Sequence, residues 1–331
     1  MNLPVPAEWA PHRAMWVGFP SHASLWEDDL APAQIETAAL VCALAGAGRE
    51  RVKVMVAGED ALAVARELIG DEVGVEIVPG VFGDIWLRDT GPIFRSPDQA
   101  AAFRFNGWGG KYRLAGDEAV AGAIARHAGA SFHGNDFVLE GGAIDHDGAG
   151  TVLTTRQCLL NDNRNPGWRP ADAEAALAEA LGVRKVIWLG DGLQNDHTDG
   201  HVDNLARFVA PGVVICPLAW GEDDPNGEIY DAAAAVIARS TDAEGRSFRV
   251  VRAPSPGRVE NDEGEVVPAS HMNFLIANGA VIVPVYNEAP GALAVRALES
   301  AFPDRQVIGL PSRALLTGGG SFHCISQQEP A

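Results

Sequence analysis

The chain has 331 residues, 47% of them hydrophobic and 21% charged, a composition typical of a globular protein. Its 44 acidic and 25 basic side chains give a formal charge of −19, which disfavours nucleic acid and anionic membranes as partners and favours small cations. The four cysteines are widely scattered without a CxxC pair, which argues against a zinc knuckle or a disulfide scaffold and fits a reducing compartment. The N-terminal residues lack the features of a secretory signal and no apolar run is long enough to span a membrane, so we expect a cytoplasmic protein.

Helices and strands are predicted along the whole chain. Six segments have the spacing, composition and end residues of helices: 33–48, 59–70, 117–130, 170–182, 227–241 and 290–302. Short β-branched runs follow most of them: 51–56, 75–78, 185–189, 247–252 and 305–310. No low-complexity linker or change of composition interrupts this α/β pattern, which favours a single domain over residues 1–331.

Five polar clusters punctuate the chain, and the first four lead into apolar, strand-like sequence. They are residues 86–92 before 101–105, 139–142 before 150–155, 197–204 before 213–217, 270–273 before 280–285, and finally 318–324. We interpret them as five similar units of helix, strand, polar loop and hairpin. Such units would pack around a common axis, where one polar loop from each would meet and form a site.

The last cluster presents a cysteine directly after a glycine-rich turn. Gly318, Gly319 and Gly320 allow unusual backbone conformations and close approach of another group, and Cys324 follows. One interpretation is a nucleophile, and the other is a core cysteine beyond a tight turn, since free cysteines are among the most buried residues. His323 is a poor candidate for its base, because consecutive strand residues point to opposite faces.

The run from His197 to Asn204 alternates its polar side chains. An extended backbone would place the imidazoles and carboxylates of this run on one face. Three interpretations stay open: a metal site, a general acid and base at His201 with Asp203 binding or orienting, or a hydrogen-bonded structural cluster. The metal interpretation, as a metal-dependent hydrolase, would use His197, Asp199, His201 and Asp203.

Three other polar features have local interpretations. Arg88 lies beside acidic residues and is predicted to close a turn through an ion pair with an aspartate. Glu140 precedes two glycines, whose turn would aim its carboxylate inward. The glycine-rich segment 105–112 lacks the Lys-Ser/Thr ending of a phosphate loop and is predicted to be a structural or substrate-facing loop.

Taken in order, seven segments resemble the agmatine deiminase family of the guanidine-modifying enzyme superfamily, which is related to the bacterial peptidyl-arginine deiminases. They are residues 6–16, 86–92, 105–111, 139–142, 197–204, 273–284 and 318–330, so the resemblance covers essentially the whole chain. It implies a five-bladed α/β propeller of ββαβ-type units with pseudo-fivefold symmetry. It also implies deimination of a guanidinium without metal or organic cofactor.

The resemblance assigns roles to particular residues. It places the nucleophile on Cys324, the acid/base imidazole on His201 and the carboxylates on Asp89, Glu140 and Asp203. Trp86 and Trp108 are candidates for contacts with the rest of the substrate. Small departures from the family pattern occur at Ile85 and at residues 321–322; the first lies near the expected position of the substrate tail.

The resemblance further implies that agmatine and water react to N-carbamoylputrescine and ammonia, a step of putrescine biosynthesis, through a covalent thiouronium on Cys324. Arginine or peptidyl-arginine is the alternative substrate. Nearby carboxylates predict a substrate-free thiol with a pKa at or above its reference value of about 8.5, which a bound cation would lower. Homo-oligomer formation is left open.

Overall fold

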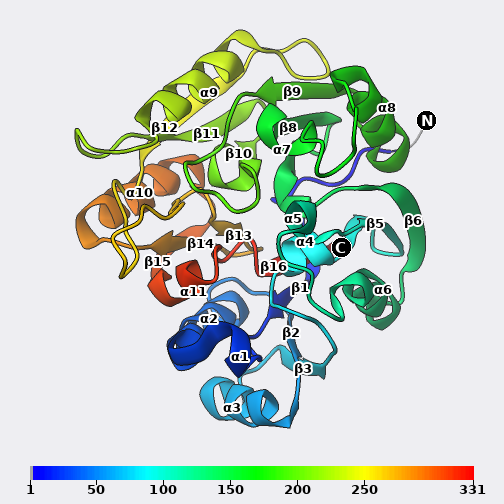
Figure 1. The fold of residues 1–331 in the computed structure, drawn as a ribbon, viewed down its shortest axis with the longest axis vertical. Helices are drawn as coiled ribbons and strands as arrows, with labels where there is room; N and C mark the ends of the chain where they lie inside the picture. Colours follow the sequence, from blue (N-terminus) through cyan, green and yellow to red (C-terminus); the bar gives the residue numbers. More distant parts are fainter. Residues whose placement is uncertain (1–2) are drawn as a thin grey trace.

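The structure, a computed structural model, describes residues 3–331 and consists of five small mixed sheets with flanking helices. Figure 1 shows the sheets following one another around the centre of the molecule. In sheet order the strands are β16 (Ser326–Pro330), β1 (His12–Gly18), β2 (Val52–Val56) and β3 (Val75–Pro79); β4 (Ile93–Ser96), β5 (Gln99–Arg104) and β6 (Ser131–Val138); β7 (Ile144–His146), β8 (Thr151–Thr155) and β9 (Lys185–Leu189); β10 (Arg207–Ala210), β11 (Val213–Leu218) and β12 (Arg249–Pro254); and β13 (Leu275–Ile276), β14 (Ala280–Val285) and β15 (Gln306–Pro311).

Longer helices connect the parallel strands within these units. They are α2 (Leu30–Ala45), α3 (Glu59–Ile69), α6 (Asp117–Ala128), α8 (Pro170–Leu181), α9 (Gly227–Arg239) and α10 (Glu288–Ala301). Short helical turns lie in the loops: α1 (Ala23–Trp26), η1 (Glu27–Asp29), α4 (Leu87–Thr90), α5 (Gly107–Gly110), η2 (Gly141–Ala143), α7 (Arg156–Leu159), η3 (Val202–Asn204) and α11 (Arg313–Thr317). None of the helices in residues 3–331 is both long and apolar enough to cross a membrane.

Each unit repeats one local topology. In the second unit, β4 and β5 form an antiparallel hairpin, α6 follows, and β6 returns parallel to β5. The next three sheets have the same antiparallel and parallel pairs. This order confirms the predicted α/β class and the ββαβ-type unit.

The first sheet joins the two ends of the chain. Strand β16 pairs antiparallel with β1, which pairs parallel with β2. Glu329 on β16 is fully buried, and it accepts hydrogen bonds from Arg13 Nε at 2.8 Å, Trp16 Nε1 at 2.6 Å and Lys53 Nζ at 2.7 Å. The C-terminal strand is therefore held by main-chain pairing and by a buried carboxylate with three charged or polar donors.

A polar loop precedes the first strand of every unit, as the five predicted clusters anticipated. The loops before β4, β7, β10, β13 and β16 carry, in that order, Asp89, Glu140, Asp203, Asn273 and Cys324. Because the units are arranged around one centre, these loops converge there (Figure 1).

The predicted helices are confirmed, with ends displaced by at most a few residues, and so are the predicted strands β2, β3, β5, β8, β9, β11, β12, β14 and β15. The prediction missed β1, β6 and the first strand of each hairpin. The first strands β7 and β13 have only three and two residues, too few for a periodic pattern. Strand β6 was missed because it is largely exposed and contains Gly134, Asn135 and Asp136, which are rare in strands.

Candidate active site

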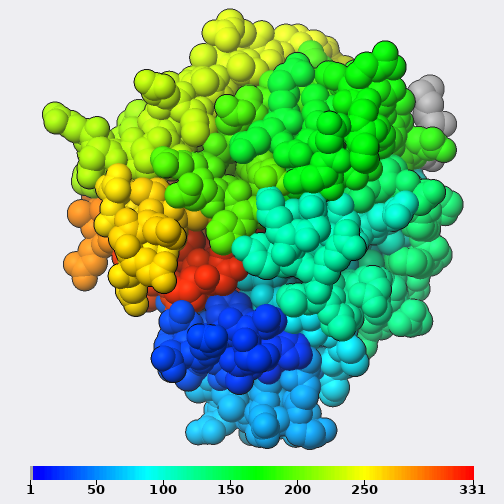
Figure 2. Space-filling model, in the orientation of Figure 1, coloured from blue at the N-terminus to red at the C-terminus, as the bar shows by residue number. Residues whose placement is uncertain are grey.

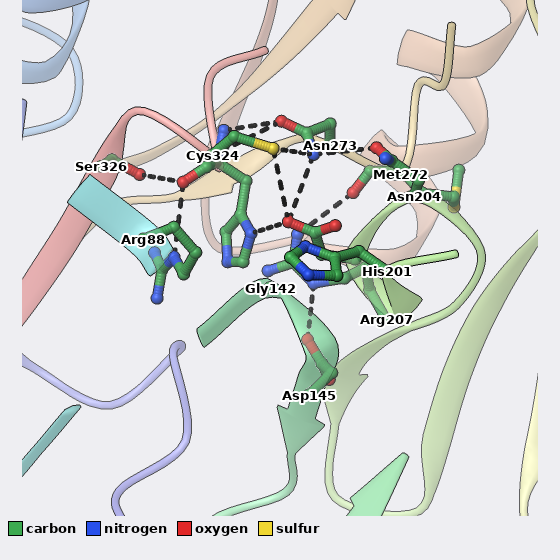
Figure 3. A network of polar contacts seen from close by, with 12 residues as sticks. Arg88, Gly142, Asp145, His201, Asn204, Arg207, Met272, Asn273, Cys324 and Ser326 are labelled. Atoms are coloured by element: carbon green, nitrogen blue, oxygen red, sulfur yellow. Dashed lines mark hydrogen bonds and ion pairs between the residues drawn. The ribbon is translucent and has the colours of Figure 1, made fainter. Parts of the chain in front are cut away.

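Figure 3 shows Cys324, Asn273, His201 and Gly142, which come from four of the polar loops, close to one another, and Asp203 contacts the first two of them. Its Oδ2 atom is 3.6 Å from Cys324 Sγ, 2.8 Å from His323 Nδ1 and 3.3 Å from Asn273 Nδ2. The side chain is fully buried, and Oδ1 has no hydrogen-bond partner within the described chain. Half of this carboxylate is thus occupied by the protein, while the other half is left for a donor from elsewhere.

The glycine-rich turn gives Cys324 its position. A Cβ on Gly320 would lie 3.1 Å from Cys324 Cβ, 3.2 Å from its sulfur and 2.6 Å from the Trp86 ring. The amide of Asn273 then holds the cysteine from two sides: its Nδ2 donates to Sγ at 3.1 Å, and its Oδ1 accepts from the Cys324 amide at 3.3 Å. A side chain at position 320 would therefore displace the thiol or Trp86.

Gly142 lies where three of the predicted site residues, His201, Asp89 and Asp203, come together, and its lack of a side chain leaves space between them. A Cβ there would lie 2.5 Å from His201 Nδ1, 3.0 Å from Asp89 Oδ1 and 3.1 Å from Asp203 Oδ2. The Gly142 amide itself donates to Asp89 Oδ1 at 2.9 Å. The η2 turn thus brings an imidazole and two carboxylates around one glycine, a role that its Gly-Gly sequence alone did not reveal.

His201 and Asp89 are buried side by side, with His201 Nδ1 3.8 Å from Asp89 Oδ2. Burial acts to lower the pKa of His201, but Asp89, the Cys158 thiol and Glu140 outweigh it and raise the pKa well above its ordinary value. Burial raises the pKa of Asp89, against the attraction of His201 and with a further contribution from Asp203. The groups around His201 therefore favour its protonated form.

Trp108 and Trp86, the two tryptophans predicted to contact the substrate, lie against the site in different ways. Trp108 Nε1 donates to Asp89 Oδ2 at 2.9 Å, so this side chain orients a site carboxylate. Trp86 Nε1 donates to Asp84 Oδ2 at 2.8 Å, and its ring lies close to Gly318 and Gly320. Trp86 thus forms a wall beside Cys324.

Glu140 is buried in the same region, but its hydrogen-bond partner is Arg164, whose Nε lies 2.8 Å from Glu140 Oε1. Arg164 also contacts Asp199, and its Nη2 donates to the Thr198 carbonyl at 2.7 Å. Arg164 was not predicted, because it comes from the loop after α7, outside the polar clusters. It ties Glu140 to the segment that carries His201.

The segment 197–204 is not an extended strand, so the predicted common face does not exist. Asp199 has a left-handed backbone with φ of 63°, and η3 follows at Val202–Asn204. His197 Nδ1 instead contacts Tyr112 Oη at 3.0 Å, and Asp199 pairs with Lys111 at 2.6 Å. The proposed metal set is therefore divided between two environments, which removes the geometric basis of the metallohydrolase interpretation.

One group in the described residues does have the proximity that a metal ion would need. Ligand atoms of Glu140, Cys158 and His201 lie within 4.8 Å of one another. This set shares only His201 with the predicted one. Arg164, bound to Glu140, places a positive charge beside it.

Behind Asp203, contacts between charged groups extend through His323 to Glu8 in the N-terminal segment. His323 contacts Asp203 through Nδ1 and Glu8 Oε2 through Nε2, the latter at 3.0 Å, so it bridges two carboxylates. Arg207 contacts Glu8, and its Nε donates to Asp145 Oδ2 at 2.6 Å (Figure 3). The pKa of Asp203 is lowered: burial opposes this, but His323 and His201 outweigh it. Neither Glu8 nor Arg207 stood out in sequence.

The predicted ion pair of Arg88 with a neighbouring aspartate is wrong. Arg88 is buried, and its Nη1 donates to Gln327 Oε1 at 3.0 Å and Gln328 Oε1 at 2.7 Å. Its Nε donates to the His323 carbonyl at 3.3 Å. Because α4 turns the side chain toward β16, Arg88 supports the C-terminal strand from behind the site.

The surroundings of Cys324 favour the thiol over the thiolate. Burial raises the pKa of Cys324 well above its ordinary value, and the carboxylates of Asp203 and Asp89 raise it further. The direction agrees with the expectation from sequence, although burial, rather than the carboxylates, is the larger cause.

Comparison with known proteins places these features in a family. The family model of Porphyromonas-type peptidyl-arginine deiminases matches residues 4–330. Agmatine deiminase of Stutzerimonas stutzeri is 40% identical over 356 residues, covering 99% of this chain and 95% of that protein. That of Pseudomonas fluorescens is also 40% identical, with the same two coverages. The solved agmatine deiminase of Enterococcus faecalis, described as catalysing its reaction, has a TM-score of 0.92 and 32% identity, covering 99% of this chain and 96% of that one.

Replacing Glu8 by Gln tests the charged chain behind Asp203. Burial acts to raise the pKa of Glu8, but Arg207 and His323 hold it well below its ordinary value. Glu8 therefore stabilises the fold above its unfolded pKa of about 4.3, and this contribution is lost as the pH falls through the folded pKa. We expect Glu8→Gln to lower the free energy of unfolding by about 3–5 kcal/mol near neutral pH.

Urea unfolding at pH 7 and pH 3 measures this difference, which should shrink by at least about 1 kcal/mol at the lower pH. Glu299→Gln, an exposed change on α10, serves as the control and should stay within about 0.5 kcal/mol of the unchanged protein at both pH values. A Glu8→Gln difference that stays constant or grows on acidification would contradict the ionised state of Glu8.

Proposed function

This chain belongs to the Porphyromonas-type peptidyl-arginine deiminase family, and we propose that it hydrolyses agmatine to N-carbamoylputrescine and ammonia. The observation that carries the proposal is the convergence of His201, Asp89 and Asp203 around Gly142, with Cys324 Sγ 3.6 Å from Asp203 Oδ2. Residues 1–331 act as one catalytic domain in this proposal, since the groups behind and within the site come from both ends of the chain.

A guanidinium complements the charge of the site. It is planar, permanently cationic and rich in N–H donors, so two carboxylates can bind it through charge-assisted hydrogen bonds. Asp203 has an unpartnered buried oxygen, and Asp89 lies on the other side of Gly142. These two carboxylates would hold the guanidinium plane beside the sulfur of Cys324.

The reaction then follows from the positions of the thiol and the imidazole. The thiol proton of Cys324 passes to solvent, the thiolate attacks the central guanidinium carbon, and His201 protonates the nitrogen that leaves as ammonia, which gives an S-alkylthiouronium. His201, now neutral, takes a proton from water, whose oxygen attacks the same carbon. The C–S bond breaks, the ureido product leaves and the thiol is restored. Glu140, fixed by Arg164, supports the charge on His201.

Substrate binding itself would generate the nucleophile. A unit charge at about 4 Å and an effective dielectric of about 20 is worth about 4 kcal/mol, or about three pK units. A bound guanidinium therefore opposes the burial and the two carboxylates that raise the pKa of Cys324. Imidazolium at His201 contributes in the same direction. The thiolate forms only when the cation that it attacks is in place.

The two cations that the sequence offered for an α-carboxylate both have protein partners in the described structure, which supports agmatine over arginine. Arg88 is buried against Gln327 and Gln328, and Lys111 is paired with Asp199. Agmatine has an ammonium group where arginine has the α-amino acid end, which suits an acidic entrance. Arginine and peptidyl-arginine are therefore the weaker candidates.

Replacing the nucleophile tests the chemistry. We expect Cys324→Ser to lower ammonia release from agmatine by about 10⁴-fold or more, the size of loss seen when a catalytic nucleophile is removed. Rapid quenching of the unchanged enzyme should trap an adduct on Cys324 with the mass of agmatine minus ammonia.

Cys42→Ser is the matched control, since this half-buried thiol lies on α2, and it should keep full activity. EDTA should have no effect on any of the proteins. Activity that survives Cys324→Ser but disappears with EDTA would replace this mechanism by a metal-dependent one.

The protonation state of Cys324 can be measured through thiolate absorbance at 240 nm. In the free enzyme we expect a pKa above the reference value of about 8.5, and at pH 7 a transient absorbance rise on mixing with agmatine. The other three cysteines also have raised pKa values, so they contribute little thiolate at pH 7. Cys324→Ser should abolish the rise. A depressed thiol pKa without substrate would exclude the substrate-assisted scheme.

Gly142→Ala tests the space between the reacting groups. Its Cβ would lie 2.5 Å from His201 Nδ1, too close for two unbonded atoms, so the imidazole must move away from the carboxylates. We expect kcat/KM for agmatine to fall by about 100-fold or more, as misplacement by about 1 Å does in other enzymes. Gly134→Ala is the control, because a Cβ on this exposed β6 residue meets nothing within 4 Å. Near-normal activity of Gly142→Ala would show that the reaction does not use this space.

A further inference from the structure

A wide cleft opens beside the nucleophile loop. It has a volume of about 1140 Å³ and is lined mainly by three segments, 194–199, 259–268 and 313–319. Its innermost lining includes Gly319, next to Gly320, whose Cβ would contact Cys324 Sγ. Figure 2 shows the C-terminal atoms, in red, at the base of the surface between blue, green and yellow segments. The cleft is larger than the range of about 300–1,000 Å³ typical of drug-sized ligands, and agmatine is smaller still.

The lining of the cleft is strongly acidic. Lys111 and Arg313 are its basic residues, and Lys111 is already neutralised by Asp199. Arg313 Nη2 donates to the Glu260 main-chain carbonyl at 3.4 Å. The carboxylates of the lining are Asp29, Asp196, Asp199, Glu260, Asp262, Glu263 and Glu265. This imbalance favours a ligand with more than one positive charge.

Asp196 has an unsatisfied atom in the wall of the cleft. The residue is 9% exposed, its Oδ1 accepts from Thr198 N at 2.8 Å and Thr198 Oγ1 at 2.6 Å, and its Oδ2 has no hydrogen-bond partner within residues 3–331. A buried carboxylate oxygen without a donor is costly unless a ligand supplies one. Asp196 directly precedes His197, which lies near Gly319, so it belongs to the inner part of the cleft.

A second group of carboxylates lies on the segment 259–268. A Glu260–Val266 bridge closes this segment into a hairpin, and Asn261 Oδ1 accepts from the amides of Glu263 and Glu265. The tip of the hairpin is thus ordered while its Asp262 and Glu263 side chains are exposed. The cleft therefore has acidic groups at two positions, Asp196 and the hairpin tip. Agmatine has one ammonium group at the end of a short methylene chain, so it can use only one of these positions.

We infer that the cleft binds guanidino polyamines, in which a second ammonium group follows the first through an aminopropyl extension of agmatine. Asp196 binds the first ammonium, and the hairpin carboxylates Asp262, Glu263 and Glu265 bind the second. The inference rests on the proposed deimination at Cys324. The chemistry is unchanged: the guanidinium C–N bond breaks, ammonia leaves, and water supplies the oxygen of the carbamoyl-polyamine.

Three substrates distinguish the levels of binding: butylguanidine without an ammonium group, agmatine with one, and aminopropyl-agmatine with two. With the unchanged enzyme, we expect kcat/KM for aminopropyl-agmatine to exceed that for agmatine by at least about fivefold. Asp196→Asn should raise KM for both amines by at least about fivefold and leave butylguanidine unaffected, a selectivity that a merely structural role would not produce.

The triple variant Asp262→Asn/Glu263→Gln/Glu265→Gln should remove the advantage of aminopropyl-agmatine over agmatine. The matched control changes charge equally at exposed sites outside the cleft, with Glu228→Gln/Glu299→Gln/Asp304→Asn, and should keep the advantage. Two outcomes would overturn this inference alone. In the first, the enzyme hydrolyses agmatine but shows no higher kcat/KM for aminopropyl-agmatine. In the second, both triple variants lose that advantage in kcat/KM equally. Absence of ammonia release from all three guanidines would instead overturn the proposed function.

Discussion

The pairing of β16 with β1 is the constraint on which the site depends, because it fixes the last residues of the chain beside the first. A chain end normally frays, and a thiol there would lose its geometry with respect to groups on other loops. Here Glu329 binds donors from β1 and β2, and Arg88 holds Gln327 and Gln328 from another unit. Cys324, two residues before β16, therefore inherits the rigidity of a buried sheet rather than the mobility of a terminus.

Charge balance is the second requirement, since so many ionised groups are buried together. Buried carboxylates are tolerated when cations and amides satisfy them, and each site acid has such a partner: Asp203 has His323, Glu140 has Arg164, and Asp89 has His201. The compensation is incomplete near the thiol, where Asp203 Oδ1 lacks a donor and the pKa of Cys324 is raised. In the proposed mechanism a bound guanidinium completes it, so affinity for the substrate and activation of the sulfur have one electrostatic origin.

The sequence predicted the helices, most strands and the convergence of five polar loops because these depend on local periodicity. Residues such as Cys324, His201 and Asp203 lie inside those loops and could be found. Glu8, Arg164 and Arg207 could not, because their importance comes from partners far along the chain, such as Glu8 with His323 and Arg207. No local pattern distinguishes a buried arginine that satisfies two carboxylates from an exposed one.

In the segment from His197 to Asn204, the backbone conformation determines which polar side chains lie together. Strand geometry would place four potential ligands on one face, which is the arrangement that a metal site needs. The left-handed conformation of Asp199 and Gly200 turns the chain instead. His197 and Asp199 therefore contact Tyr112 and Arg164, whereas His201 lies beside Asp89 and Asp203 contacts the thiol. Glycine at position 200 adopts a positive φ with little strain, because it has no Cβ. The same polar residues therefore divide into His197 and Asp199, which line the cleft, and His201 and Asp203, to which the proposed mechanism assigns acid–base chemistry and substrate binding.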